Sequence, residues 1–195
     1  MKRYATIVAD PPWDVAAGRS IGRYELREDG TQAFGVTDNA ARPLAYPTMT
    51  VEQIKALQVP AAEDAHLYLW TTNGYLPAAL EVVKAWGFTY STLLTWAKNV
   101  MGGGMGGAYG ISTEHILFCR RGSLKAHGRV GGTWFNWKRP YDERGKPRHS
   151  AKPREFFAMV EDVSPGPYLE MFARDKRDCW HAWGNEVESD VEIAA

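Results

Sequence analysis

The chain has 195 residues, and its 23 Lys and Arg residues balance its 23 Asp and Glu residues, so that its formal net charge is zero. This length suits one domain with a sizeable core, and a hydrophobic content of 45% is typical of a folded globular protein. Two cysteines, Cys119 and Cys179, are too few for a disulfide framework and indicate a reducing cytoplasm. Because no apolar run approaches the roughly 20 residues needed to cross a bilayer, the sequence predicts no membrane-spanning helix.

The apolar run 4–9 predicts a buried strand, because it is short and contains β-branched residues. Residues 14–45 contain several glycines and no clear periodicity, so we expect a long irregular loop there. Thr50, with Gln53 in the capping-box position, predicts a helix over 51–58. Residues 66–70 predict the next strand.

Asn73 is expected to cap a helix that continues through Trp86 and ends at Gly87. Strands are predicted over 89–97 and 114–119, a helix from Pro153 to about residue 162, a turn over 164–167 and a last strand over 168–172. Because strands alternate with helices, the predicted fold class is α/β, with a mostly parallel, doubly wound sheet.

Asp10-Pro11-Pro12-Trp13 follows the first predicted strand, and ligands bind at the carboxyl ends of strands in open α/β sheets. Each proline fixes its own φ and restricts the residue before it, so the acid is held stiffly. Neither proline carries an N–H, and we expect the local carbonyls to be free acceptors. A carboxylate, carbonyl acceptors and an indole together suit a flat base that carries an amino group.

Charge is distributed unevenly along the chain. Residues 115–154 contain 11 Lys and Arg but 2 Asp and Glu, whereas residues 155–195 contain 3 and 10. The basic block is interleaved with Trp134, Phe135, Trp137 and Tyr141, and cations combined with stacking rings are typical of a nucleic-acid groove. A solvated loop that happens to be basic is the alternative interpretation.

Other motifs argue against several enzyme classes. Gly102, Gly104 and Gly107 match a dinucleotide-binding pattern, but a strand rather than a helix is predicted after them, so we reject it. The sequence contains no phosphate-binding Gly-Lys-Ser/Thr and no Gly-x-Ser-x-Gly element. Its five histidines lack metal-ligand spacing, and we predict no metal.

Six stretches of the chain recur, in this order, in one known family. They are 9–13 (Ala-Asp-Pro-Pro-Trp), 46–49 (Tyr-Pro-Thr-Met), 67–72 (Leu-Tyr-Leu-Trp-Thr-Thr), 86–88 with 95–98, 114–117, and the long match from His149 to Glu186. Together they make the chain resemble the mRNA-adenosine N6-methyltransferase catalytic-subunit (METTL-type) family and its prokaryotic and phage relatives.

The resemblance implies a Rossmann-like methyltransferase fold with permuted motif order, S-adenosylmethionine as cofactor, and a flipped-out adenine as substrate. Asp10 would bind the methionine amino group, the Pro11 carbonyl would accept from the target amine, and Trp13, Tyr46 and Trp96 are candidates to stack on the base. The implied catalytic residues are Asp10, Pro11, Pro12 and Trp13; the cofactor-binding residues are Asp10, Lys152, Glu170, Phe172, Arg174, Asn185 and Glu186; and the substrate-binding residues are Tyr46, Trp96, Lys98, Glu114 and His149.

The expected function is therefore S-adenosylmethionine-dependent methylation of adenine N6 in DNA, by one domain over 1–195 with substrate loops at 14–45, 99–112 and 123–152. The preference for DNA rests on the compact, prokaryote- or phage-like form of the chain. Two alternatives stay open: an RNA adenosine N6-methyltransferase, and a catalytically silent subunit that binds nucleic acid. Nucleic acid is the expected partner, no membrane is expected, and the protein would be a monomer or a homodimer in the cytoplasm.

Overall fold

The computed structural model describes residues 2–14, 47–98, 110–146, 148 and 151–194, together with two short strands at 23–26 and 32–35. Within those ranges, no helix is both long enough and apolar enough to cross a membrane. The elements are β1 (Tyr4–Ala9), β2 (Arg23–Leu26), β3 (Gln32–Gly35), α1 (Val51–Ala56), β4 (Ala61–Thr71), the 3-10 turn η1 (Asn73–Tyr75), α2 (Leu76–Ala85), β5 (Thr89–Ala97), β6 (Thr113–Arg121), β7 (Trp134–Phe135), α3 (Arg154–Val163), β8 (Tyr168–Met171) and β9 (Trp180–Trp183).

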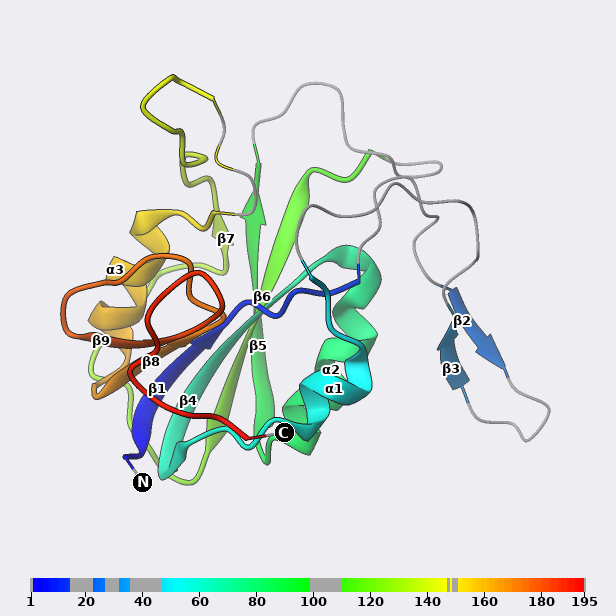
Figure 1. Cartoon of the computed structure of the whole chain (residues 1–195), viewed down its shortest axis with the longest axis horizontal. Coiled ribbons are helices and arrows are strands. Elements are labelled where there is room, and N and C mark those ends of the chain that lie inside the picture. Colours follow the sequence, from blue (N-terminus) through cyan, green and yellow to red (C-terminus); the bar gives the residue numbers. More distant parts are fainter. Residues whose placement is uncertain are drawn as a thin grey trace.

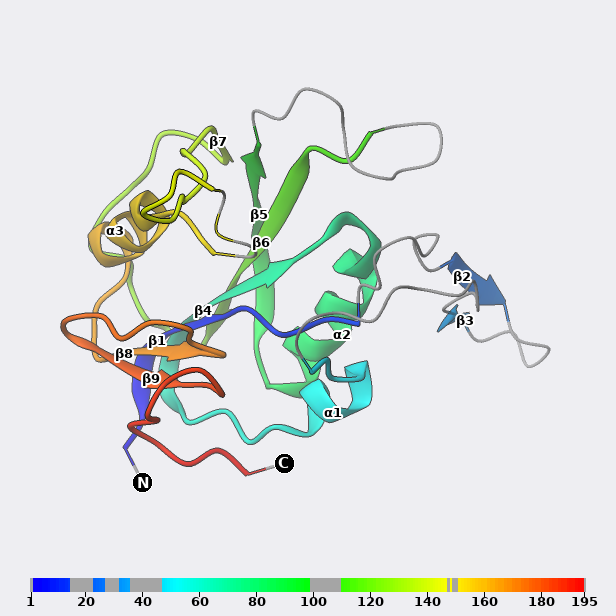
Figure 2. The ribbon, with the colours of Figure 1, turned by 45° about the horizontal axis from the view of Figure 1, so that its top comes forward.

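Seven of the strands form one sheet in the order β7-β5-β6-β4-β1-β8-β9. Four of its six neighbouring pairs are parallel, and β6 runs antiparallel to both β4 and β5. Helices α1 and α2 cover one face, and α3 covers the other (Figures 1 and 2). The predicted mostly parallel, doubly wound α/β sheet is confirmed.

Alternation of side chains along β1 and β4 builds a separate core on each face of the sheet. Ile7 and Leu69 pack with the residues of α1 and α2. Val8 and Trp70 point to the opposite face, where Trp70 meets Phe156 of α3 edge to face with the ring centroids 4.8 Å apart. Because both faces are buried, these strands read as continuous apolar runs in the sequence.

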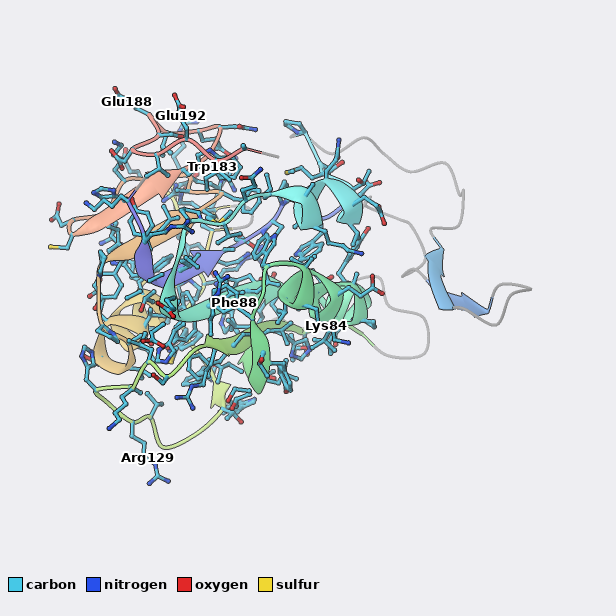
Figure 3. All side chains as sticks on the ribbon, turned by 90° about the horizontal axis from the view of Figure 1, so that it is seen from below. Lys84, Phe88, Arg129, Trp183, Glu188 and Glu192 are labelled. Carbon is cyan, nitrogen blue, oxygen red and sulfur yellow. The ribbon has the colours of Figure 1, made fainter. Side chains whose placement is uncertain are left out.

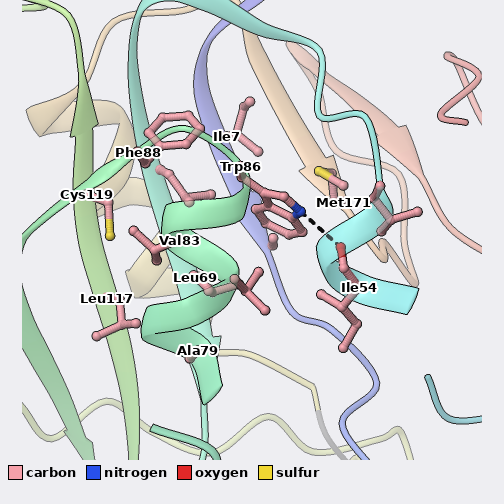
Figure 4. Close-up of a cluster of buried hydrophobic side chains, with 14 of the residues drawn as sticks. Ile7, Ile54, Leu69, Ala79, Val83, Trp86, Phe88, Leu117, Cys119 and Met171 are labelled. Carbon is pink, nitrogen blue, oxygen red and sulfur yellow. Dashed lines mark hydrogen bonds between the residues drawn. The ribbon is translucent and has the colours of Figure 1, made fainter. Parts of the chain in front are cut away.

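The core under α1 and α2 contains one buried hydrogen bond that joins the two helices. The indole Nε1 of Trp86 donates to the backbone carbonyl of Ile54 at 2.9 Å (Figure 4). Gly87 follows with φ of +75°, which favours glycine and turns the chain into β5. The predicted capping box of Thr50 and Gln53 is present, although α1 ends at Ala56 rather than at residue 58.

Asn73 does not cap α2, contrary to our expectation. It lies inside η1, where its Nδ2 donates to both the carbonyl and the Oγ1 of Thr113, each at 3.1 Å, and its Oδ1 lies 3.1 Å from Nε2 of His115. Its amide is therefore engaged by β6, and it ties the start of that strand to the loop after β4.

Three further differences concern short strands. The expectation of an irregular 14–45 segment is wrong where β2 and β3 pair antiparallel. No sequence pattern predicted β7, which has two residues, or β9, which has four. Strands this short carry too few alternations to show a period of two, and pairing with β5 and β8 defines them.

Candidate active site

One edge of the sheet collects most of the predicted site residues. β1, β4, β5, β8 and β9 all point the same way, so their carboxyl ends meet there, and the antiparallel β6 begins there. Asp10 follows β1, Lys98 follows β5, Glu114 is the second residue of β6, and Asn185 and Glu186 come after β9. Strand direction therefore explains why residues far apart in the sequence converge.

Lys152, just before α3, joins two of these groups. Its Nζ lies 2.8 Å from Oδ2 of Asp10 and 3.4 Å from Oε2 of Glu114, and Lys98 Nζ donates to the other carboxylate oxygen of Glu114. The ammonium of Lys152 also lies over the ring of Trp70, 4.9 Å from the centroid. The side chains of Lys152, Glu114 and Asp10 are 11%, 18% and 29% exposed, so these charges interact through a largely dry environment.

The environment separates the acidities of the two carboxyl groups. Burial raises the pKa of Asp10, an effect that Lys152 only partly reverses. Burial would also raise the pKa of Glu114, but Lys152 and Lys98 outweigh it and hold that pKa below its usual value. Burial alone would lower the pKa of Lys152, yet the two carboxylates more than offset this and raise it. At neutral pH Glu114 is therefore an anion and Lys152 a cation. Asp10, whose pKa is raised, is the group of the three whose protonation a bound ligand can change.

The Asp-Pro-Pro-Trp turn is more fully hydrogen-bonded than its sequence suggests. The Trp13 N–H donates to the Pro11 carbonyl at 2.8 Å, and the Met49 N–H donates to the Pro12 carbonyl at 3.0 Å. The expectation of free proline carbonyls is therefore wrong, because the chain supplies its own donors. Each carbonyl keeps a second lone pair, so Pro11 can still accept from a ligand.

The two indoles expected to stack on a base are buried. Trp13 is 3% exposed, donates from Nε1 to the Trp70 carbonyl at 3.0 Å and packs against Tyr75. Trp96 is 2% exposed and donates from Nε1 to the Trp137 carbonyl at 3.0 Å. Neither ring presents a free face in this structure, so both shape the site from within the core. Tyr46 and His149, the remaining residues expected to touch substrate, lie outside the described residues, as do the glycines at 102, 104 and 107.

Two turns at the end of β8 and β9 complete the edge. Phe172 follows β8 with φ of +64°, a strained conformation of the kind that concentrates at ligand sites, and its ring packs against Trp183. A Cβ on Gly184 would lie 2.3 Å from the carbonyl oxygen of Ala173, so only glycine lets the two turns approach this closely. Arg174 Nε lies 2.8 Å from Oε1 of Glu186, which links the same two turns by charge.

Glu170 lies one position before the end of β8, level with Val8 of β1, and its side chain is 15% exposed. Burial raises the pKa of Glu170 to about 7, although Arg177 pulls it down. Arg177 was not predicted from the sequence. No linear motif marks it, because its contacts come from β8 and α3.

The donors and acceptors at this edge fit S-adenosylmethionine. Asp10 and Lys152 complement an ammonium and a carboxylate, and the exposed Asn185 and Glu186 complement hydroxyl groups. The buried atoms Glu170 Oε2 and Arg177 Nε have no hydrogen-bond partner within the described structure, so this region retains capacity for a polar ligand. Among the described residues, no group of three or more His, Cys, Asp or Glu could hold a metal ion.

Comparison with known proteins agrees with this geometry. The MT-A70 family model matches residues 4–186. The chain is 26% identical over 198 residues to the Type II methyltransferase M.MunI of a Mycoplasma species, and the match covers 98% of this chain and 82% of that protein. It is 24% identical over 200 residues to the human N(6)-adenosine-methyltransferase catalytic subunit METTL3, covering 95% of this chain and 28% of that subunit.

A Medicago truncatula MT-A70-like protein is 25% identical over 195 residues, and this chain spans 26% of its length. The chain thus accounts for most of the bacterial relative and for little more than a quarter of these two eukaryotic ones. The family match extends from β1 to Glu186 and so contains every site residue described above. The chain belongs to the MT-A70 family, whose members are Rossmann-like methyltransferases that use S-adenosylmethionine.

Proposed function

We propose that this protein transfers a methyl group from S-adenosylmethionine to the N6 amine of adenine in DNA. The observation that carries the proposal is the contact of Lys152 with Asp10, at 2.8 Å, inside an intact Asp-Pro-Pro-Trp turn. It joins the residues expected to face the target amine to those expected to hold the cofactor. The same contact argues against a catalytically silent binding subunit, which would not need this charged arrangement.

The cofactor would be held by residues from three parts of the chain. Lys152 would pair with its carboxylate, Asp10 with its ammonium group, and Glu170, Asn185 and Glu186 with its ribose hydroxyls. When bound, S-adenosylmethionine supplies an electrophilic methyl group on a sulfonium.

The protein would contribute mainly by positioning the adenine amine, because displacement at a methyl group requires the nucleophile in line with the leaving sulfur. The Asp10 carboxylate and the Pro11 carbonyl would each accept one N–H of the adenine amine, which orients the nitrogen lone pair toward the methyl group. Once methylated, the amine is cationic and acidic, and its proton can pass to Asp10 Oδ or to water. A strong base is therefore unnecessary, and the raised pKa of Asp10 makes its carboxylate a better acceptor for this proton.

Of the expected substrate loop 123–152, the structure describes residues 123–146, 148, 151 and 152. Phe135 and Trp137 stack on each other and, partly buried, pack against the core, whereas Trp134 and Tyr141 are 64% and 59% exposed. Exposed cations accompany these rings, and Arg129 projects on the side opposite the acidic Glu188 and Glu192 (Figure 3). Cations and free ring faces support binding of a polyanion that carries bases.

DNA is favoured over RNA because the relative matched over most of its own length is a type II methyltransferase, a class that acts on DNA. RNA is the second candidate, favoured by the similarity to N(6)-adenosine-methyltransferases. Two free cysteines within the described structure, one of them exposed, support a reducing compartment such as the cytoplasm.

The test is competition between DNA and RNA oligonucleotides of matched sequence, each in single- and double-stranded form, with radiolabelled cofactor and one limiting substrate. The proposal predicts that DNA takes most of the label and that digestion yields N6-methyladenine. Preferential labelling of RNA would establish the second candidate, and label on cytosine would overturn both.

A further inference from the structure

Arg177, in the turn before β9, is held by both its backbone and its side chain. Its own carbonyl accepts from the Trp180 N–H at 3.1 Å, which fixes the turn that leads into β9. Its guanidinium lies over the Phe157 ring of α3, with Cζ 3.5 Å from the ring centroid. A guanidinium held on a ring face directs its N–H groups outward in the ring's plane. Here that direction leads to Glu170.

Arg177 Nε and Glu170 Oε2 lie 3.6 Å apart, beyond hydrogen-bond distance. Both atoms are shielded from solvent, and neither has a hydrogen-bond partner within the described structure. One hydroxyl group can satisfy both at once, since a hydroxyl donates to a carboxylate and accepts from a guanidinium N–H. The bridge is stronger when Glu170 is ionised, because a carboxylate accepts at both oxygens whereas a protonated carboxyl turns one oxygen into a donor.

The other charges around Glu170 do not keep it ionised. Asp10 at the end of β1 and Asp175 in the turn both favour the protonated form, as does burial itself. On the neighbouring strand, β9 places the uncharged Ala182 level with Glu170, and α3 contributes the ring beneath Arg177. Lys152 is committed to Asp10 and Glu114, and Arg174 to Glu186. Arg177 is the cation paired with Glu170.

We propose that Arg177 is a positioning residue that favours the ionised form of Glu170 and orients it toward a hydroxyl group of the cofactor. This inference rests on the proposed function, because it takes the edge beside Asp10 as the cofactor site. It adds a residue that acts through Glu170 rather than on the reacting atoms. It also predicts that cofactor affinity rises with pH across the neutral range, since the hydroxyl binds the carboxylate form.

The experiment measures the affinity of the whole 195-residue chain for S-adenosylhomocysteine by calorimetry between about pH 5.5 and pH 9. Wild type should gain affinity with a midpoint near 7, where the pKa of Glu170 lies. In Arg177→Met the midpoint should move up by about one pH unit or more, because a neighbouring cation lowers a carboxyl pKa by that order. At pH 7 the ionised fraction then falls from about one half to about one tenth, a roughly fivefold loss of affinity that recovers at high pH.

Three variants separate this role from a general structural one. Arg177→Lys keeps the charge and should restore most of the wild-type midpoint. Glu170→Gln should bind weakly with no midpoint near 7, and adding Arg177→Met to it should introduce no new pH dependence. Lys176→Met removes a cation from the same turn, where Lys176 pairs with the surface Asp190, and should leave the midpoint unchanged.

A loss in Arg177→Met that is equal at every pH would overturn the inference, as would a wild-type affinity that is flat across neutral pH. Either result leaves the proposed function intact as long as S-adenosylhomocysteine binds. Failure of the wild-type protein to bind it at any pH would instead contradict the proposed function itself.

Discussion

Lys152→Met tests whether the charged group at the sheet edge is a cooperative unit. In the wild type, the Lys152 ammonium neutralises Asp10 and Glu114 at 2.8 and 3.4 Å. Methionine fills similar volume but leaves two carboxyl groups facing each other with one fewer cation. Breaking a fully buried pair costs about 3–5 kcal/mol, and partial exposure of the two carboxylates screens some of this, so we expect about 2–3 kcal/mol of lost unfolding free energy at neutral pH.

The loss should depend on pH in a defined direction. In the wild type the lysines hold the pKa of Glu114 below its usual value, so this group adds stability above that value and loses it as the pH falls. In Lys152→Met, burial and mutual repulsion raise the pKa of both carboxyl groups above their unfolded values. The penalty is then largest at neutral pH and shrinks as the groups become protonated, toward about pH 4.

Urea denaturation followed by tryptophan fluorescence, at about pH 7.5 and about pH 5, measures both effects. Lys55→Met is the matched control, because Lys55 pairs with Glu81 at 3.5 Å on the surface, with side chains 35% and 50% exposed. It should cost less than about 1 kcal/mol at either pH. A Lys152→Met penalty no larger than that of Lys55→Met, or one that does not diminish at the lower pH, would refute the reasoning.

Three further experiments test separate parts of the structure. Gly184→Ala forces apart the turns that follow β8 and β9. It should therefore lower the free energy of unfolding, measured in denaturant, by more than about 1 kcal/mol, and it should weaken binding of S-adenosylhomocysteine. Unchanged binding would show that the close approach is dispensable. Trp134→Ala should weaken oligonucleotide binding about fivefold or more with no change in Tm, whereas Trp137→Ala should lower Tm; the reverse pattern would contradict the assignment of exposed and core rings. Cys119 is buried, with its pKa raised by burial to about 12, and Cys179 is exposed, so iodoacetamide should add one label to the native protein by mass spectrometry, and rapid double labelling would show that the core opens.

Local signals in the sequence predicted the elements whose form is decided locally. The strand Thr89–Ala97 and the capping box at Thr50 appear as expected, because each depends on residues close together in the chain. Asn73 shows where local chemistry fails: it has the side chain of a good cap, but β6 engages its amide first. Tertiary contacts override a capping preference that is worth about 1 kcal/mol.

The features of the candidate site also fall into those that the sequence could predict and those that only the fold reveals. Asp10 could be placed from its position after a predicted strand, and Lys152 and Glu170 from the family resemblance. The hydrogen bonds of the Pro11 and Pro12 carbonyls could not, because their donors depend on the turn's conformation and on Met49, far along the chain. Arg177 was missed because its role comes from a ring on α3 and a carboxyl on β8, which only the fold brings together.

Methylation by Asp10→Asn, compared with wild type on the same adenine-containing DNA, tests the central claim most directly. The substitution keeps the size of the side chain and removes the charge that pairs with Lys152 and that we propose faces the target amine. With thermal unfolding confirming a folded variant, we expect methyl transfer to fall by at least about a hundredfold, and the wild-type product to be N6-methyladenine when the modified base is mapped. Full activity in the folded Asp10→Asn variant, or no methylated adenine from the wild-type protein, would contradict the assignment.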